Sequence, residues 1–247
     1  MMADVVAGMQ ARLDALPPAL DSRRAFLETY RRTTLAVAAA VDGAAFEDPR
    51  WVEAWDVAFA ELYLRALDAD LAGAGGVPPV PRPWRLAFDA PASLPPLRRV
   101  LLGINAHINY DLPQALLTVI SDEDFDDPVL LDRRRRDHAR IDGVLSARVA
   151  AEDDELGRLA APSLLDRALT PLNRLSSRRF LREARQKVWL NTTELQQARA
   201  AGGGRYEVRL AELEVLSAAK IADLLAPGQV LLRLAVAGFG VVLPPAA

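Results

Sequence analysis

Apolar residues recur at intervals of three and four positions along most of the chain, the spacing that places side chains on one face of an α-helix. One predicted helix begins at Asp48-Pro49, because Asp is a preferred N-cap and Pro is favoured in the first helical turn. It carries an apolar stripe of Trp51, Trp55, Phe59, Leu62, Tyr63 and Ala66, and an earlier helix carries Phe26, Tyr30, Leu35 and Val37. We expect the stripe that begins at Trp51 to lie in the core. The alternative is that Trp55 and Tyr63 line a pocket.

The same periodicity predicts further helices over 97–121, 128–152 and 211–225, with one or two helices over 163–197 that break near Pro171. The pattern shows no ladder of strands and no alternation of strands with helices. We therefore predict an all-α fold, a single-domain helical bundle spanning 1–247. The most apolar stretch, 230–243, is too short to span a bilayer, and we expect a buried helix or strand pair there.

The segment 73–96 interrupts the helical pattern because it is rich in Pro and Gly. Proline lacks an amide donor and blocks helix interiors, so this segment is predicted to be a connecting loop. Trp84, Leu86 and Phe88 alternate within it and would anchor it to the body by burial. A connection of this length is uncommon unless it covers something, which makes it a candidate lid.

Composition excludes several classes of protein. The chain has no cysteine, which excludes disulfides, thiolate zinc sites, iron–sulfur clusters and cysteine nucleophiles. Its formal charge of −3 gives no reason to expect nucleic acid as a partner. The first residues lack the pattern of an export signal, and no stretch is long enough for a transmembrane helix. We expect a cytoplasmic protein that acts on a small molecule, partly apolar in character.

The two histidines carry the clearest chemical signal. Each is followed four residues later by an aspartate, as His107 with Asp111 and His138 with Asp142, so each pair lies on one helix face. The pairs are also symmetric about the acidic segment 122–127. If the two helices pack antiparallel about that segment, each His faces the Asp of the other helix. Two imidazoles and two carboxylates that converge in this way suit a divalent metal such as zinc, iron or manganese. Two metal-free interpretations stay open, a catalytic or ligand-binding cluster and a purely structural network.

The first pair lies in a mostly apolar segment, so its polar neighbours need buried partners. Asn105, Asn109 and Tyr110 are candidates to orient ligands or substrate, together with Trp55, Tyr63 and Trp84 from the other predicted elements. Pro113 is expected to kink the helix just past Asp111.

Charged segments flank the second pair. The arginine run 133–136 is either a solvated helix face or an anchor for phosphate. The acidic segment 122–127 is expected to be a solvated turn, because it lacks the alternating ligands of a calcium loop. A basic amphipathic stretch, 178–189, follows later in the chain. Four residues in or near it could reach the pocket: Glu183, Arg185, Trp189 and Asn191.

The sequence Asn-Ala-His-Ile-Asn-Tyr-Asp-Leu-Pro over 105–113, with the later His138 and Asp142, resembles a family of actinobacterial helical proteins catalogued only as a domain of unknown function. The resemblance extends over most of the chain and implies an all-helical fold. It implies no activity.

Three functions compete. The first is a metal-dependent enzyme, a hydrolase or lyase in which His107, Asp111, His138 and Asp142 hold one ion. The second is a metal-free cyclase or tailoring enzyme for natural products that uses a His–Asp pair for acid–base catalysis. The third is a non-catalytic ligand-binding or scaffold protein.

Overall fold

The computed structural model describes residues 1–73, 78–159, 164–228 and 238–245. These residues form helices and connections without a strand, which confirms the predicted all-α fold. The helices are α1 (Met2–Ala15), the 3-10 helix η1 (Pro18–Arg23), α2 (Arg24–Asp42), α3 (Pro49–Leu71), α4 (Arg82–Phe88), α5 (Pro96–Ala106), the π-helix η3 (His107–Asp111), α6 (Leu112–Val119), α7 (Asp122–Asp126), α8 (Pro128–Leu159), α9 (Leu164–Ala201) and α10 (Arg205–Leu225).

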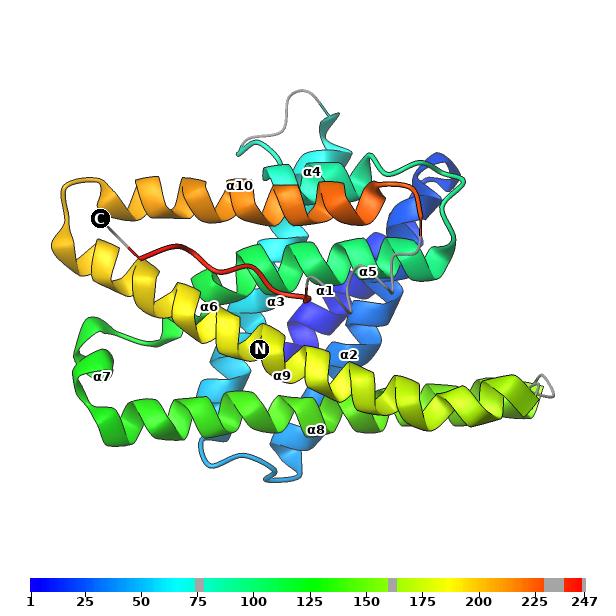
Figure 1. Ribbon diagram of the computed structural model, residues 1–247, viewed down its shortest axis with the longest axis horizontal. Coiled ribbons are helices and arrows are strands. Elements are labelled where there is room, and N and C mark those ends of the chain that lie inside the picture. The colour runs from blue at the N-terminus through cyan, green and yellow to red at the C-terminus, as the bar shows by residue number, and fades with distance from the viewer. Residues whose placement is uncertain (74–77, 160–163, 229–237, 246–247) are drawn as a thin grey trace.

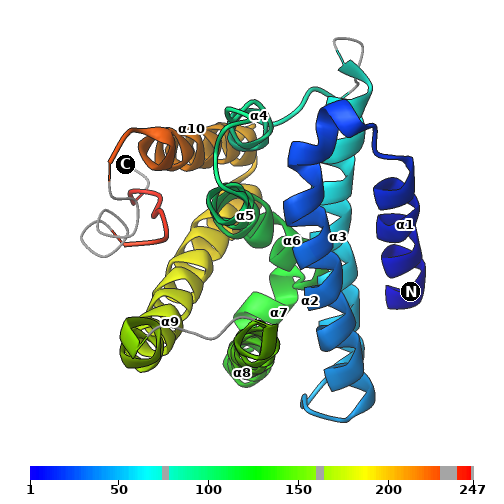
Figure 2. The ribbon, with the colours of Figure 1, turned by 90° about the vertical axis from the view of Figure 1, so that its right-hand side faces the viewer.

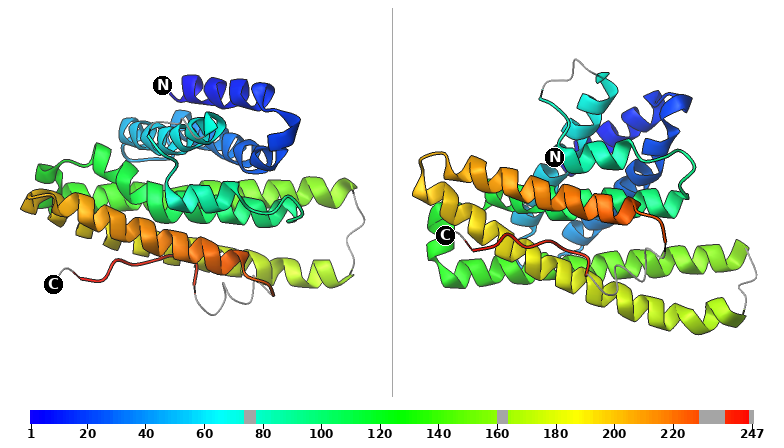
Figure 3. Two further views of the ribbon diagram at one scale, coloured as in Figure 1. Left: turned by 90° about the horizontal axis from the view of Figure 1, so that it is seen from above. Right: turned by 45° about the horizontal axis from the view of Figure 1, so that its top comes forward.

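The helices are stacked in layers around α5, η3 and α6, which form one continuous rod at the centre (Figure 1). On one side of this rod lie α2 and α3, with α1 outside them (Figure 2). On the other side lie α9 and α10, and the C-terminal residues run along their outer face (Figure 3). Residues on η3 therefore have packed neighbours on two sides.

The start of α3 follows the sequence prediction. Asp48 caps the helix by accepting a hydrogen bond from the backbone N–H of Trp51 at 3.1 Å, and Pro49 occupies the first turn. The aromatic stripe that begins at Trp51 is buried as expected, and it packs with α2 and α6 in the main hydrophobic core.

The predicted loop 73–96 is wrong in part, because Arg82–Phe88 forms the short helix α4. Pro83 lies in its first turn, where no intrahelical amide donor is needed. Trp84 and Phe88 are four residues apart, so both lie on the face that packs into the core. Trp84 and Phe88 are thus buried as expected, whereas Leu86, two residues from each, is only partly buried.

The central rod contains a π-helix immediately before Pro113. Pro113 has no N–H to donate to the carbonyl of Asn109, so an α-helix there would leave that acceptor unpaired. The chain instead widens into the π-helix η3 immediately before it, and the residues at both junctions keep right-handed helical backbone angles. A π-helical turn inside an α-helix is frequent at functional sites.

Three other expectations are corrected. The acidic segment forms α7 with a capping box between Ser121 and Asp124. Helix α9 continues through Pro171 without the predicted break. Of the apolar stretch 230–243, residues 230–237 lie outside the described residues, and the rest is extended and is neither helix nor strand. Among the described helices, none is long and apolar enough to cross a membrane.

Candidate functional site

His107 and Asp111 form a buried pair on the π-helix η3. Atom Nδ1 of His107 lies 2.8 Å from Oδ2 of Asp111, and the indole Nε1 of Trp84 donates to the same oxygen over 2.8 Å. Because a tryptophan N–H can only donate, Oδ2 acts as an acceptor. Nδ1 of His107 therefore carries its proton toward Asp111, and Nε2 keeps its lone pair.

Aromatic side chains enclose the imidazole of His107. The ring of Phe59 stacks on it with centroids 3.5 Å apart, and the ring of Tyr30 meets it edge-on at 4.5 Å. Three more rings lie within about 6 Å, those of Trp84, Tyr63 and Phe26. All of these side chains are buried. The walls come from α2, α3 and α4, so the site is assembled from segments distant in sequence.

Burial sets the protonation of the pair. It lowers the pKa of His107, and the hydrogen bond and charge of Asp111 only partly oppose this. It raises the pKa of Asp111, against the opposing effects of His107 and the Trp84 N–H. The imidazole is consequently neutral near pH 7, with an unprotonated Nε2 that can accept a proton.

Several buried polar atoms around this cage have no hydrogen-bond partner within the protein: Nε2 of His107, the hydroxyls of Tyr30 and Tyr63, and Oδ2 of Asp56. Burial raises the pKa of Asp56 to about 7. Burial also raises the pKa of Tyr30, and the nearby carboxylates of Asp56 and Asp111 add to this effect. Buried polar groups are normally paired, so each of these atoms is a candidate to bind a polar atom of a ligand.

His138 lies in a second buried cluster. Its Nδ1 accepts a hydrogen bond from Nε1 of Trp189 at 3.1 Å, and its Nε2 lies 3.2 Å from Nη1 of Arg185. Arg185 in turn pairs with Asp142, and the ring of Trp55 packs edge-on against His138. Burial, followed by the charge of Arg185, lowers the pKa of His138 well below its usual value. Both nitrogens therefore face donors from the protein.

The four predicted metal ligands do not gather into one group. The described residues hold no cluster of three or more His, Cys, Asp or Glu that could bind a metal. Helix α8 does run opposite to α5 and α6 (Figure 1), but it packs on α2, α7 and α9. The aromatic stripe of α3 explains this, because Phe59 stacks on His107 while Trp55 contacts His138.

The other predicted site residues lie in different parts of the structure. Trp84 and Tyr63 line the cage of His107. Asn105 donates to the carbonyl of Leu101, and Asn109 donates to the side chain of Asn105 and to the C-terminal segment. Tyr110 packs in a second apolar cluster with Leu117, Leu195, Leu213 and Leu243. Asn109 and Tyr110 thus contact the α9–α10 side of the rod, away from the cage on its other side.

Three of the four arginines in the run on α8 are ion-paired within the protein, and Arg135 lies over the ring of Trp189. Arg133 and Arg134 lie against Asp48, and Arg136 bonds Glu47. The buried carboxylate of Asp137 accepts the backbone N–H groups of Glu47 and Asp48 at 2.8 and 2.7 Å. These contacts fix the connection before α3 and account for the run without a bound phosphate.

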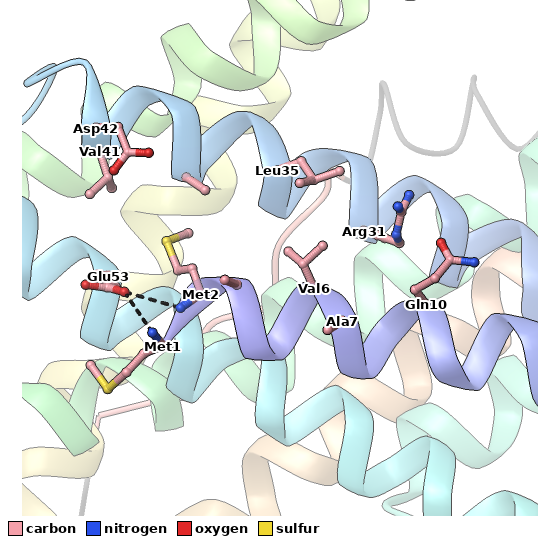
Figure 4. Close-up of a pocket in the computed structure, with 12 residues that line it drawn as sticks. Met1, Met2, Val6, Ala7, Gln10, Arg31, Leu35, Val41, Asp42 and Glu53 are labelled. Carbon is pink, nitrogen blue, oxygen red and sulfur yellow. Dashed lines mark hydrogen bonds and ion pairs between the residues drawn. The ribbon is translucent and has the colours of Figure 1, made fainter.

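Hollows on the described surface lie away from His107. One, of about 500 Å³, lies between α1 and α2, with Arg31 and Gln10 at one end and Asp42 and Glu53 at the other (Figure 4). Another, of about 400 Å³, lies where α9 turns into α10. Neither is lined by His107 or Asp111.

Sequence reasoning did not mark four residues at or beside the cage as site residues, namely Phe26, Tyr30, Phe59 and Asp56. Phe26 and Tyr30 belong to a helix whose apolar stripe was recognised, but nothing in the pattern ties that helix to His107. Asp56 had a usable signal. It is an acid on an otherwise apolar helix face, four residues after Val52 and three before Phe59.

Comparison with known families shows which family the chain belongs to. The family of unknown function DUF5995 matches residues 2–227. The chain therefore belongs to this family, as its resemblance to a family without an assigned activity predicted. Neither the curated proteins nor the solved structures contain a match to the chain.

Proposed function

We propose that this member of the DUF5995 family is a metal-free enzyme that binds a small, partly apolar molecule beside His107 and transfers protons to and from it. One observation carries the proposal. Nε2 of His107 is buried and has no hydrogen-bond partner within the protein, on an imidazole that aromatic rings enclose, while Nδ1 is held by Asp111. An oriented neutral imidazole of this kind is a general base.

Each neighbour of His107 has a role in this chemistry. When Nε2 takes a proton, the carboxylate of Asp111 stabilises the resulting imidazolium, and the Trp84 N–H keeps that carboxylate in place. Asp56, with a pKa of about 7, is partly protonated at neutral pH and can return a proton. His107 as base and Asp56 as acid have Tyr30 as a common neighbour. Such a pair suits isomerisation, cyclisation or elimination, in which a proton leaves one atom and another arrives elsewhere.

The substrate must enter through an element that moves, because the rings around His107 are buried. Helix α4 is the best candidate. It is only seven residues long, and it contributes Trp84 to the wall of the cage. Its displacement would open the cage and at the same time release the N–H that holds Asp111.

Metal-dependent hydrolysis or lysis, with zinc, iron or manganese, stays a prediction. The geometry favours it less, because both nitrogens of His138 face donors and one of these is the cation of Arg185. A metal bound there would have to displace Trp189 and Arg185. Binding without catalysis is the other remaining possibility.

The test compares wild type, His107→Asn and Asp142→Asn in incubations with a library of small ketones, esters and lactones, followed by mass spectrometry. We expect at least one compound to be converted by wild type and by Asp142→Asn, and about 10²- to 10⁴-fold more slowly by His107→Asn. Asp142 is the matched control, because it is required only if a metal binds all four residues. Equal conversion by His107→Asn, or none by wild type, overturns the proposal. Loss in both variants together with a stoichiometric bound metal supports the metal-dependent alternative.

A further inference from the structure

The described C-terminal residues 238–245 run in extended form along α9 and beside α10 (Figures 1 and 3). They form no backbone ladder with another strand among the described residues. Side chains of η3, α9 and α10 bind their backbone instead.

Two buried asparagines bind this backbone through the same pattern of hydrogen bonds, at positions of the segment that are two residues apart. Asn109 donates to the carbonyl of Phe239 at 3.4 Å and accepts from the N–H of Val241 at 3.2 Å. Asn191 donates to the carbonyl of Val241 at 3.0 Å and accepts from the N–H of Leu243 at 2.8 Å. An amide that pairs with both a C=O and an N–H replaces the partner strand that an extended chain otherwise needs.

Cationic side chains bind the intervening carbonyls. Lys220 donates to the carbonyl of Gly238 at 2.6 Å and Lys187 to that of Gly240 at 3.1 Å. Arg209 donates to the carbonyl of Pro244. These hydrogen bonds involve only main-chain carbonyl groups of the segment. Any extended segment whose side chains fit the groove can therefore form them.

The side chains add selectivity at three positions. Phe239 and Leu243 are buried, and Leu243 enters the second apolar cluster. Gly240 passes so close to α9 that an added Cβ would lie 2.7 Å from Cδ of Lys187. Val242 points outward and is 41% exposed. The groove therefore fits an aromatic residue, then glycine, then a leucine four positions after the aromatic residue.

The family match covers the residues that form the groove but not those that occupy it. Asn109, Asn191, Lys187, Lys220 and Arg209 all lie within residues 2–227, which the family match covers, whereas the C-terminal segment lies beyond it. Without that segment, two buried asparagines would lose the partners of their amide groups.

We propose that this groove is a recognition site for an extended polypeptide with an aromatic–Gly–x–x–Leu pattern, carried by a partner protein, and that residues 238–245 occupy it as a displaceable intramolecular ligand. Because residues 238–245 belong to the same chain as the groove, they compete with a partner's segment at a high effective concentration. The partner therefore binds only when it is abundant or when residues 238–245 are released. This proposal does not depend on the catalytic one, although Asn109 and His107 share the π-helix η3.

The experiment uses the full chain and a fluorescent peptide with the sequence of residues 238–245. Leu243→Asp places a charge in the apolar cluster and should release the segment, whereas Val242→Asp, at the exposed neighbour, should leave it seated. We expect anisotropy titrations to show at least tenfold tighter peptide binding to Leu243→Asp than to wild type or Val242→Asp. A peptide with Asp in place of its Leu should not bind any of the three.

A second measurement needs no variant. Amide hydrogen exchange over residues 238–245 of the wild-type chain should become at least fivefold faster when unlabelled peptide is added in large excess, and the Asp-substituted peptide should have no such effect. Binding of the peptide to folded Leu243→Asp, or this acceleration, supports the proposal. Failure of both overturns it and makes the segment a fixed part of the core.

Discussion

Replacing Asp56 with asparagine should remove a large pH dependence from the stability of this protein. The carboxyl group is buried on α3, its Oδ2 has no partner, and its pKa is about 7 in the folded chain against 3.8 for an exposed Asp. Asparagine has nearly the same shape and stays neutral at every pH. The comparison therefore isolates the cost of ionising this one group.

The sign and size of this pH dependence follow from the difference between the pKa values of Asp56 in the folded and unfolded chain. Because folding raises the pKa, the stabilising contribution of Asp56 is fully present below about pH 4 and is lost as the pH rises to about 7. A rise of about three pKa units corresponds to roughly 4 kcal/mol of unfolding free energy. For a chain of this length that is roughly 10 °C in melting temperature.

The assay is urea or thermal unfolding at several pH values between 4 and 8, for wild type and for Asp56→Asn. We expect wild type to lose about 4 kcal/mol relative to the variant over this range. Glu61→Gln on the exposed face of the same helix is the control, and its curve should stay parallel to that of wild type. Parallel curves for Asp56→Asn would mean that Asp56 ionises normally, which would refute the buried, unpartnered carboxyl beside Tyr30.

Two further predictions concern packing and charge. Gly103→Ala should destabilise the protein by about 1–3 kcal/mol, because the new Cβ would overlap the ring of Phe26, whereas Gly143→Ala on α8 meets no atom within 4 Å and should stabilise it by up to about 1 kcal/mol. Chemical denaturation of both variants checks this, and equal effects would contradict it. Arg185→Met should raise the pKa of His138 in an NMR titration, since it removes the facing charge, and an unchanged titration would show that Arg185 does not act on His138.

The sequence alone determined the local elements. Spacings of three and four fixed the helical class and the face of α3 that is buried, because helical periodicity needs no information beyond the segment itself. The Asp48-Pro49 start of α3 is likewise local chemistry. The pairing of His107 with Asp111 was readable for the same reason, since four residues make one helical turn.

The rules that relate proline to helix ends predicted the structure less well. Proline ends helices in most contexts, yet Pro83 begins α4 and α9 continues through Pro171. Pro113 follows the π-helix η3 and lies at the start of α6. The presence of proline alone did not distinguish these outcomes, because it is compatible with more than one backbone conformation.

Tertiary structure decided the site. The symmetric spacing of the His–Asp pairs predicted that they face each other, but Trp55 and Phe59 of α3 each contact one of the two histidines. The sequence could not reveal this, because the order in which helices stack depends on contacts between distant segments. For the same reason only the fold shows that Asn109 and Asn191, 82 positions apart, bind one extended strand of the chain's own C-terminal segment.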